Sequence, residues 1–582
     1  MLKTLGAHIK EYKKASILTP IFMAGEVLME TIIPLMMASI VDNGINMGNM
    51  RHVYLMGGAM ILSAIVSLWF GINGAKNAAY ASMGFGKNLR NAMFERIQTY
   101  SFANIDRFST SSLITRITTD VSHTQMAYFM IIRLAMRAPI CLIMAMVFSF
   151  SINARLACVY LVAVVVLGVL LFTIAKIAMK HFSQTFTKYD AMNESIQENI
   201  TGIRVVKSFV RGEHEKKKFF GTSMNVYKMF SKAESVIVWN SPLMSLTVSC
   251  CVLFISWFGA QYIIGGSMET GDLMAMLSYC MSILMNLMML SMVFVMISIS
   301  LAAGRRICEV LKEDSTITNP EEPIYEVADG SIEFDNVSFR YSQTSEAPVL
   351  DNINLKIASG ETIGIIGGTG SSKSTLISLI SRLYDTDQGT VSLGGIDVRN
   401  YDLDVLRNQV AVVLQKNILF SGTILENLRW GDADATEEDC INACKQACAH
   451  DFIMSFPDGY QTHIEQGGSN VSGGQKQRLC IARALLKQPK VLILDDSTSA
   501  VDTATDAKIR SALKEAIPGT TKIIIAQRIS SVQEADRIIV MHDGRINGVG
   551  THEELLENNE IYRDVYEMQT TAGGDFDEGG AN

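Results

Sequence analysis

The sequence predicts a multi-domain membrane protein, in which an all-α domain of six transmembrane helices is fused to an α/β domain. The chain of 582 residues is 48% hydrophobic and has a mean hydropathy of +0.22, so it is too long for one domain and too apolar for an ordinary soluble protein. Most of this apolar character lies before about residue 305. The second half instead contains short apolar runs of strand length, one of which precedes a glycine-rich turn and a helical pattern.

Six apolar stretches in the first half are each long enough to span a hydrocarbon layer about 30 Å thick. They lie at about 16–40, 53–80, 128–150, 154–179, 240–266 and 272–302. Helical periodicity continues through the segments 81–127 and 180–239, so we expect long cytoplasmic helical extensions. Residues 1–15, with four lysines, are typical of an amphipathic helix at the membrane interface.

The distribution of basic residues predicts the orientation of these spans. Residues 176–240 contain eleven Lys or Arg, whereas the loop at 267–272 contains none. The positive-inside rule therefore places both termini and the two long helical extensions in the cytoplasm. We expect a multi-pass protein of the plasma (inner) membrane, with domains at 1–15 (interfacial helix), 16–304 (transmembrane), 305–329 (linker), 330–570 (α/β) and 571–582 (disordered acidic tail).

A phosphate-binding loop occupies residues 367–375, with the sequence Gly-Gly-Thr-Gly-Ser-Ser-Lys-Ser-Thr. The apolar run 361–366 precedes it and residues 376–383 have helical spacing, so a strand, a turn and a helix N-terminus aim backbone N–H groups at phosphate. We expect an α/β P-loop nucleotide-binding domain, in which Lys373 reaches the β- and γ-phosphates and Ser374 binds Mg²⁺. The remaining contacts are expected from Gly367, Gly368, Thr369, Gly370, Ser371, Ser372 and Thr375.

Later motifs supply the rest of an ATP site. The apolar strand 491–495 ends in Asp495, a carboxylate suited to holding Mg²⁺ beside the phosphates. The sequence Val-Ser-Gly-Gly-Gln at 471–475 opens a helix and offers free backbone N–H groups to an anion. Tyr341 is placed to stack on adenine and Gln415 ends a strand. Taken singly these two are more often a packing aromatic and an ordinary polar residue, and only the order of the motifs favours the ATP site.

In this order the motifs resemble those of ATP-binding cassette (ABC) exporters of the half-transporter type, and the resemblance covers residues 1–567. The matching positions are the A-loop Tyr341, the Walker A loop, the Q-loop Gln415, the signature 471–475, Walker B at 491–495 and the D-loop 499–502.

The resemblance implies a head-to-tail pair of chains, in which each ATP lies between one chain's Walker motifs and the other chain's signature. On this view Gln415 joins Ser374 and Asp495 around Mg²⁺. The partner's ATP would be contacted by Ser472, Gly473, Gly474 and Gln475.

Three positions depart from the family pattern. Asp496 occupies the place of the usual catalytic glutamate, Gln527 that of the switch histidine, and Ser372 that of a loop glycine. The shorter carboxylate falls short of the attacking water and the neutral amide cannot become cationic, so ATP on this chain's own Walker motifs is expected to turn over slowly. Because the signature is intact, we expect the degenerate-site subunit of a heterodimeric, bacterial multidrug-type exporter. Neutral drift within a working site is the alternative.

The sixth apolar stretch offers a candidate substrate surface. Its methionines recur along one helix face and include Met281, Met285, Met288 and Met292, which suits varied apolar ligands. A face that packs on lipid or on another helix is the alternative. Glu26 and Glu30 in the first stretch, and Arg133 and Arg137 in the third, are spaced i, i+4. Structural ion pairs are the favoured interpretation, and attraction of cationic compounds is the other.

The remaining features restrict the partners. A net charge of −8 without a basic stripe argues against nucleic acid. Cys440, Cys444, Cys448 and His450 share a helix face, but their spacing is unlike that of usual zinc sites, so metal binding there is disfavoured. Segments 101–119 and 199–215 resemble the coupling regions that join membrane helices to nucleotide-binding domains.

Together these features predict an ATP-driven exporter subunit with ATP and Mg²⁺ as cofactors and a second half-transporter as partner. The lipid bilayer is a further expected partner, and the expected substrates are amphipathic drugs or lipids. A lipid or peptide exporter is the rival within transport. A nucleotide-gated channel or regulatory membrane protein is the rival outside it.

Overall fold

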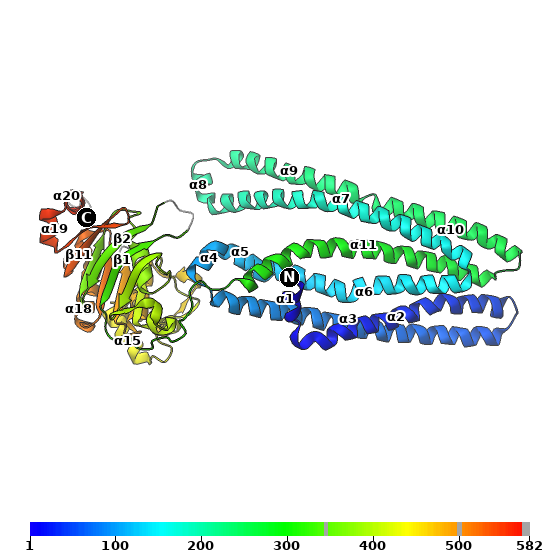
Figure 1. Ribbon diagram of the computed structural model, residues 1–582, viewed down its shortest axis with the longest axis horizontal. Coiled ribbons are helices and arrows are strands. Elements are labelled where there is room, and N and C mark those ends of the chain that lie inside the picture. Colours follow the sequence, from blue (N-terminus) through cyan, green and yellow to red (C-terminus); the bar gives the residue numbers. More distant parts are fainter. Residues whose placement is uncertain (343–346, 497–502, 573–582) are drawn as a thin grey trace. The chain divides into compact units, whose positions relative to one another are not determined.

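The computed structural model describes residues 1–342, 347–496 and 503–572, and the chain divides into two compact units (Figure 1). The helical unit comprises Met1–Thr99 and Ser109–Glu313. The α/β unit comprises the chain from Asp314 onward together with the short segment Tyr100–Phe108. The expected D-loop at 499–502 and all but the start of the expected tail lie outside the described residues.

The helical unit is built from long helices joined by short helical pieces. The long helices are α2 (Lys13–Ser39), α3 (Met50–Gln98), α6 (Val121–Ile152), α7 (Ala154–Thr201), α9 (Gly212–Ile237), α10 (Asn240–Ile264) and α11 (Thr270–Lys312). The short pieces are α1 (Leu2–Ala7), η1 (Lys10–Tyr12), η2 (Ile40–Ile45), α5 (Thr110–Thr115), η3 (Arg116–Asp120) and α8 (Ile203–Ser208).

Within the described chain, six helical segments are long and apolar enough to cross a membrane, which confirms the six expected spans. They are Lys10–Ile45, Met50–Gln98, Thr110–Ile152, Ala154–His181, Gly212–Ile264 and Thr270–Phe294. At a rise of 1.5 Å per residue, α3 and α7 are each about 70 Å long, more than twice the thickness of the hydrocarbon layer. These helices therefore continue well beyond the apolar layer.

Residues 1–15 differ from the single helix expected there. Helix α1 ends at Ala7, a tight 3₁₀ turn covers Lys10–Tyr12, and α2 begins at Lys13. Lys10 has a left-handed backbone (φ 41°), which a continuous right-handed helix cannot contain. Farther along the chain, α11 continues to Lys312 and so extends past the expected boundary at residue 304.

Close contacts of α11 with α2 and η2 fix how α11 is rotated in the helical unit. The N–H of Gly271 donates to Asp42 Oδ1 at 2.8 Å, and a Cβ atom at Gly271 would lie 2.4 Å from the carbonyl oxygen of Ala38. The buried Tyr279 hydroxyl donates to the Thr31 carbonyl at 2.5 Å. Because these bonds are buried, they hold one face of α11 against α2 and determine which face remains uncovered.

The α/β unit contains two larger sheets. The six-stranded sheet has the order β12 (Arg545–Gly550), β11 (Arg537–His542), β3 (Thr362–Ile366), β10 (Thr521–Ile525), β9 (Val491–Asp495) and β6 (Val410–Val413), and only β12 pairs antiparallel. The antiparallel sheet has the order β2 (Leu350–Ile357), β1 (Ile332–Phe339), β4 (Gln388–Leu393) and β5 (Ile396–Asp397).

Helices and one small ribbon complete this unit. The helices are α4 (Phe102–Phe108), α12 (Lys373–Ile380), α13 (Leu403–Gln409), α14 (Ile424–Leu428), α15 (Glu437–Gln446), α16 (His450–Met454), α17 (Gly473–Leu485), α18 (Thr503–Ala516), α19 (His552–Asn558) and α20 (Glu560–Ala572). The ribbon pairs β7 (Gly422–Thr423) with β8 (His463–Ile464).

The three middle strands of the parallel sheet position the site. All residues of β9 and β10 are buried, and so are all but the first residue of β3. Such continuous apolar strands are typical of a parallel sheet covered on both faces. Since β3, β10 and β9 are parallel neighbours, their carboxyl ends meet at one edge, where ligands bind in open α/β sheets.

Candidate functional site

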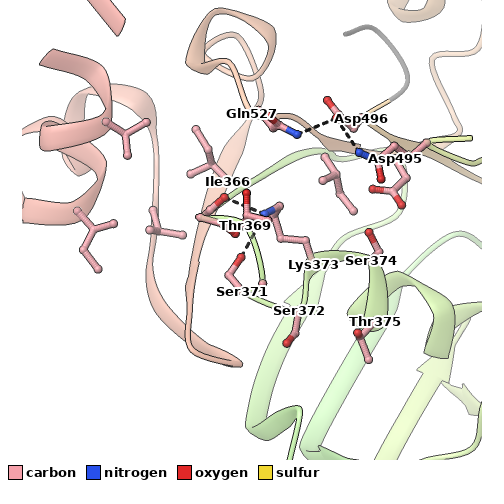
Figure 2. Close-up of a pocket in the computed structure, with 18 of the residues that line it drawn as sticks. Ile366, Thr369, Ser371, Ser372, Lys373, Ser374, Thr375, Asp495, Asp496 and Gln527 are labelled. Carbon is pink, nitrogen blue, oxygen red and sulfur yellow. Dashed lines mark hydrogen bonds between the residues drawn. The ribbon is translucent and has the colours of Figure 1, made fainter. Parts of the chain in front are cut away.

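A cavity of about 560 Å³ lies at the carboxyl ends of β3, β9 and β10 (Figure 2). It is lined by the expected phosphate-binding loop from Gly367 to Thr375 and by Gln415, Asp495, Asp496 and Gln527. The structure thus brings together residues that are up to 160 positions apart in the sequence. Neither Tyr341 nor the signature residues Ser472–Gln475 belong to the described lining of this cavity.

Ser372 has the backbone conformation that explains why glycine is usual at its position. It lies at the N-terminus of α12 with φ 69° and ψ 24°, in the left-handed region. A residue with a Cβ atom pays about 1 kcal/mol or more for this conformation. The loop therefore keeps the usual backbone shape although its residue type departs from the pattern.

Lys373 folds over this loop. Its ammonium donates to the carbonyl oxygens of Gly367 and Gly368, at 2.8 and 2.9 Å, and to the Ser371 hydroxyl at 3.2 Å. Burial lowers the pKa of Lys373, and the nearby carboxylates of Asp495 and Asp496 partly oppose that effect. The positive charge of Lys373 thus lies in a small, partly desolvated space, where it would attract an anion strongly.

The donors around Asp495 fit a hard divalent cation. Burial raises the pKa of Asp495, the neighbouring Asp496 raises it further, and a hydrogen bond from Ser374 and the charge of Lys373 oppose the rise. A carboxylate destabilised by burial and by a second carboxylate gains from a bound cation. Carboxylate and hydroxyl oxygens are ligands that Mg²⁺ prefers, so the residues present fit this ion.

Two amides hold the carboxylate of Asp496. Gln527 Nε2 donates to Asp496 Oδ2 at 2.9 Å, and Gln415 Nε2 donates to the same oxygen at 3.1 Å (Figure 2). Asp496 itself has a left-handed backbone, with φ 45°. Two amide N–H groups therefore share one oxygen of this carboxylate. Two of the three residues that depart from the family pattern, Asp496 and Gln527, are therefore direct partners.

The signature caps a helix elsewhere in the α/β unit. Ser472 and Gln475 form a reciprocal capping box at the start of α17, with Ser472 N–H donating to Gln475 Oε1 at 2.9 Å. Ser472 and Gly473 are exposed. This helix N-terminus is preformed and accessible from outside the chain.

An aromatic cluster beside the loop contains a residue that the sequence reasoning missed. Tyr341 is 52% exposed, and its hydroxyl hydrogen-bonds to the hydroxyl of Thr375 at 3.0 Å. The Tyr384 ring packs edge-on against Tyr341 at 5.1 Å between centroids, and its hydroxyl donates to Asp106 Oδ2 at 2.7 Å. Burial and the Asp106 carboxylate both raise the pKa of Tyr384. Tyr384 therefore connects helix α4 with the expected adenine-binding residue.

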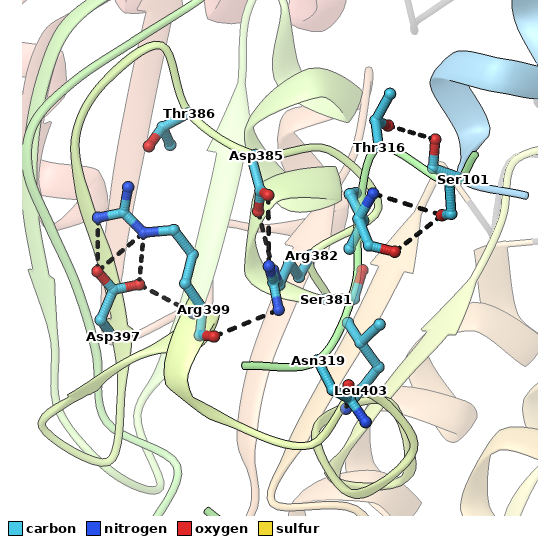
Figure 3. A network of polar contacts seen from close by, with 12 residues as sticks. Ser101, Thr316, Asn319, Ser381, Arg382, Asp385, Thr386, Asp397, Arg399 and Leu403 are labelled. Atoms are coloured by element: carbon cyan, nitrogen blue, oxygen red, sulfur yellow. Dashed lines mark hydrogen bonds and ion pairs between the residues drawn. The ribbon is translucent and has the colours of Figure 1, made fainter. Parts of the chain in front are cut away.

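Polar contacts fasten α4 to the segment that follows α11 (Figure 3). The hydroxyls of Ser101 and Thr316 hydrogen-bond at 2.6 Å, and Asn104 Nδ2 donates to the Asp314 carbonyl at 3.2 Å. Farther along this segment, Asn319 Oδ1 accepts the N–H of Leu403 at 3.0 Å. These bonds explain why Tyr100–Phe108 belongs to the α/β unit although it lies between two membrane helices in the sequence.

The cysteine cluster of the α/β unit is part of its core. Cys440 and Cys444 are fully buried among apolar residues, and burial raises the pKa of Cys444 to about 12. No group of three or more His, Cys, Asp or Glu side chains suited to a metal ion occurs among the described residues. The arrangement is that of buried apolar thiols.

In the helical unit, the two sets of candidate substrate residues have different surroundings. Met281, Met285, Met288 and Met292 are between 44% and 70% exposed, so a large part of each side chain is left uncovered by the described residues. Glu30 accepts two hydrogen bonds from Arg137 Nη2, at 2.6 and 2.9 Å, and Glu26 lies 3.8 Å from the same nitrogen. This geometry favours a structural ion pair for the carboxylates.

Comparison with known proteins identifies the family. Residues 17–311 match the ABC transporter transmembrane region, and residues 350–499 match the ABC transporter family. This chain belongs to the ABC transporter family. It is an ATP-hydrolysing membrane transporter of the exporter type, with six transmembrane helices fused to one nucleotide-binding domain.

Curated relatives resemble this transporter over most of their length. The ABC transporter ATP-binding protein YfiB of Bacillus subtilis is 36% identical over 97% of this chain and 98% of its own. An ATP-dependent lipid A-core flippase of Syntrophus aciditrophicus is 32% identical over 83% of this chain and 80% of its own. A bacterial Atm1-family ABC exporter, solved with ATP bound, has the same fold, with a TM-score of 0.84 and 23% identity over 96% of this chain and 99% of its own.

The contact between Tyr384 and Asp106 yields a testable expectation. We expect Tyr384→Phe to leave ATP affinity nearly unchanged and to reduce stimulation of the ATPase of the assembled transporter by its substrate about two- to fivefold, because it removes one charge-assisted hydrogen bond to α4. Asp106→Asn should act similarly, whereas Tyr325→Phe, at an exposed tyrosine of the same unit, should have no effect. Equal stimulation in all three variants and the wild type would contradict this role.

Proposed function

We propose that this transporter is the degenerate-site subunit of a heterodimeric exporter of amphipathic drugs or lipids in the plasma (inner) membrane. In this assignment its Walker motifs retain ATP and hydrolyse it slowly. Its intact signature completes the competent site of a second half-transporter. The termini and the nucleotide-binding domain lie in the cytoplasm, in agreement with the excess of basic residues in the helical extensions.

The observation that carries the proposal is the length and the hydrogen bonding of the Asp496 side chain. At the position of the usual base, this carboxylate is one methylene shorter and accepts hydrogen bonds from both Gln527 and Gln415. A base that is short and already hydrogen-bonded is a poor acceptor for a proton from water. Gln527 cannot take up a proton, so it cannot offset the charge that develops on a phosphate.

Nucleotide retention is supported by the remainder of the cavity. The backbone of Gly367–Thr375 and the Lys373 ammonium would hold the phosphates, and Tyr341 would stack on the base. Ser374 and Asp495, with Gln415, would hold Mg²⁺, which when bound neutralises phosphate charge. The proposed direct contacts to ATP and Mg²⁺ thus come from residues that match the family pattern, except Ser372, whose loop keeps its usual shape.

Pairing with a second half-transporter is supported by two complementary surfaces of the chain. The segment around α8 exposes apolar side chains, with Val205, Phe209 and Val210 between 60% and 87% exposed. The α/β unit has an open groove of about 380 Å³ in which the exposed rings of Phe420 and Trp430 stack at 4.0 Å. Exposed apolar patches of this kind mark interaction sites, and the partner's equivalent of α8 is the expected occupant.

An amphipathic substrate is supported by the methionine face of α11. Unbranched thioether side chains adapt to apolar ligands of different shape. These methionines are largely exposed among the described residues, so they could line a cavity shared with the partner. The similarity to a lipid A-core flippase supports a substrate with lipid-like, amphipathic character.

Restoring the missing groups tests the catalytic proposal. The wild-type chain purified alone should bind ATP with little hydrolysis, since both of its sites lack the base. Asp496→Glu combined with Gln527→His should raise the ATPase rate of that homodimer at least about tenfold. The homodimer of the Lys373→Ala variant gives the background rate of ATP hydrolysis. Robust hydrolysis by the wild-type homodimer, stimulated by an amphiphile, would refute the degenerate site.

Transport in vesicles tests the substrate proposal and separates a pump from a channel. In inside-out vesicles that contain both half-transporters, a fluorescent amphiphile should accumulate against its gradient only with ATP and Mg²⁺. Met285→Ala combined with Met292→Ala should raise the half-saturating concentration about three- to tenfold. Leu62→Ala with Ile65→Ala, at equally exposed positions of α3, is the matched control. Flux that only follows the gradient would indicate a channel.

A further inference from the structure

The C-terminal helix α20 borders the nucleotide cavity and contacts the loop that carries Gln527. Ile561, Tyr562 and Val565 of α20 line the same cavity as the phosphate-binding loop. One turn beyond Val565, Gln569 makes two hydrogen bonds to the backbone of the segment after β10. Its Nε2 donates to the Gln527 carbonyl at 2.8 Å, and its Oε1 accepts the N–H of Ile529 at 2.9 Å. A single side chain thus bridges both ends of a three-residue stretch.

These two bonds determine where the Gln527 side chain points. The stretch from Gln527 to Ile529 follows the buried strand β10, which ends at Ile525, and leads into the short helical turn Ile529–Ser531. Fixing the carbonyl of the first residue and the N–H of the third removes most of the freedom of the intervening peptides. Gln527 is then held with its Nε2 2.9 Å from Asp496 Oδ2.

Helix α20 is anchored independently of Gln569. Tyr562 is completely buried, its hydroxyl hydrogen-bonds to His552 Nδ1 at 2.7 Å, and its N–H donates to Asn559 Oδ1 at 2.9 Å. The Gln569 side chain is exposed. Loss of its amide should therefore leave α20 in place and affect only the loop that it braces.

We propose that Gln569 is a positioning residue of this nucleotide site, through which the C-terminal helix holds Gln527 against Asp496. The inference rests on the proposed retention of ATP by this chain. It assigns to α20 a role in how long nucleotide stays bound. The two hydrogen bonds of Gln569 go to the backbone, so they act on the loop whichever side chain is present at position 527. Their effect on Asp496, however, depends on the Gln527 amide.

Dissociation of ATP measures this effect directly. The full chain is loaded with α-labelled ATP and Mg²⁺, and release is followed after addition of excess unlabelled ATP. Gln569→Ala should speed release about two- to fivefold, the effect expected from the loss of one exposed and one part-buried neutral hydrogen bond. Thr570→Ala is the matched control, because Thr570 is exposed on the same helix and its hydroxyl bonds only to the Tyr566 carbonyl among the contacts described. The midpoint of thermal unfolding should not change in either variant.

A double-variant cycle distinguishes positioning from a general structural effect. If Gln569 acts through Gln527, then adding Gln569→Ala to Gln527→Ala should produce no further acceleration of release. Release from Gln569→Ala equal to that from Thr570→Ala, or full additivity in the double variant, would overturn the proposal. Rapid hydrolysis of the labelled ATP by the wild-type chain would instead refute the degenerate site. In that case the rate of ADP formation, measured in the same four proteins, would still test whether Gln569 positions Gln527.

Discussion

Burial of three parallel strands is the constraint on which the nucleotide site depends. β3, β10 and β9 are almost wholly buried and mostly apolar, and their pairing fixes a common register. Their carboxyl ends carry the phosphate-binding loop, the segment of Gln527, and the pair Asp495 and Asp496. Groups far apart in the sequence are thereby held within hydrogen-bond distance, at an edge where the backbone of α12 begins.

At this edge of the sheet, the groups suited to binding phosphate differ from the groups at the positions that would activate water. In the proposed site the loop backbone and Lys373 would bind phosphate, and Ser372 keeps the loop geometry by adopting a left-handed conformation. Catalysis requires a free base at the position of Asp496, whose carboxylate instead accepts two amide hydrogen bonds. On the proposed assignment the site would hold nucleotide and activate water poorly. ATP would then be a lasting ligand that favours the closed arrangement of two nucleotide-binding domains.

The sequence predicted the elements whose pattern is local. Long apolar runs gave the six spans, and the loop, the Walker B strand and the signature are recognisable from contiguous residues. It did not predict contacts that depend on tertiary packing. Asp106 and Tyr384 are 278 residues apart, and nothing in either segment indicates that they meet. Gln569 was missed because an exposed glutamine in a C-terminal helix has no distinguishing pattern, and its role follows only from the position of the loop beside it.

Differences at the helix ends have a similar origin. Periodicity alone favours one helix over residues 1–15, yet the left-handed backbone of Lys10 divides it. Likewise the apolar character that marks the sixth span ends before the helix does, and α11 continues as a polar helix to Lys312. Hydropathy identifies the buried or membrane part of a helix, whereas its length is set by capping and by packing at its ends.

The most direct test of the asymmetry is the nucleotide content of this chain's Walker site during turnover. In the purified pair of half-transporters, a photoreactive ATP analogue labelled on the γ-phosphate is allowed to cycle and is then crosslinked. Label should persist on this chain for many turnovers while the partner chain loses it, and Lys373→Ala should abolish that label and impair transport. Loss of the γ-label from both chains at the same rate would contradict the account.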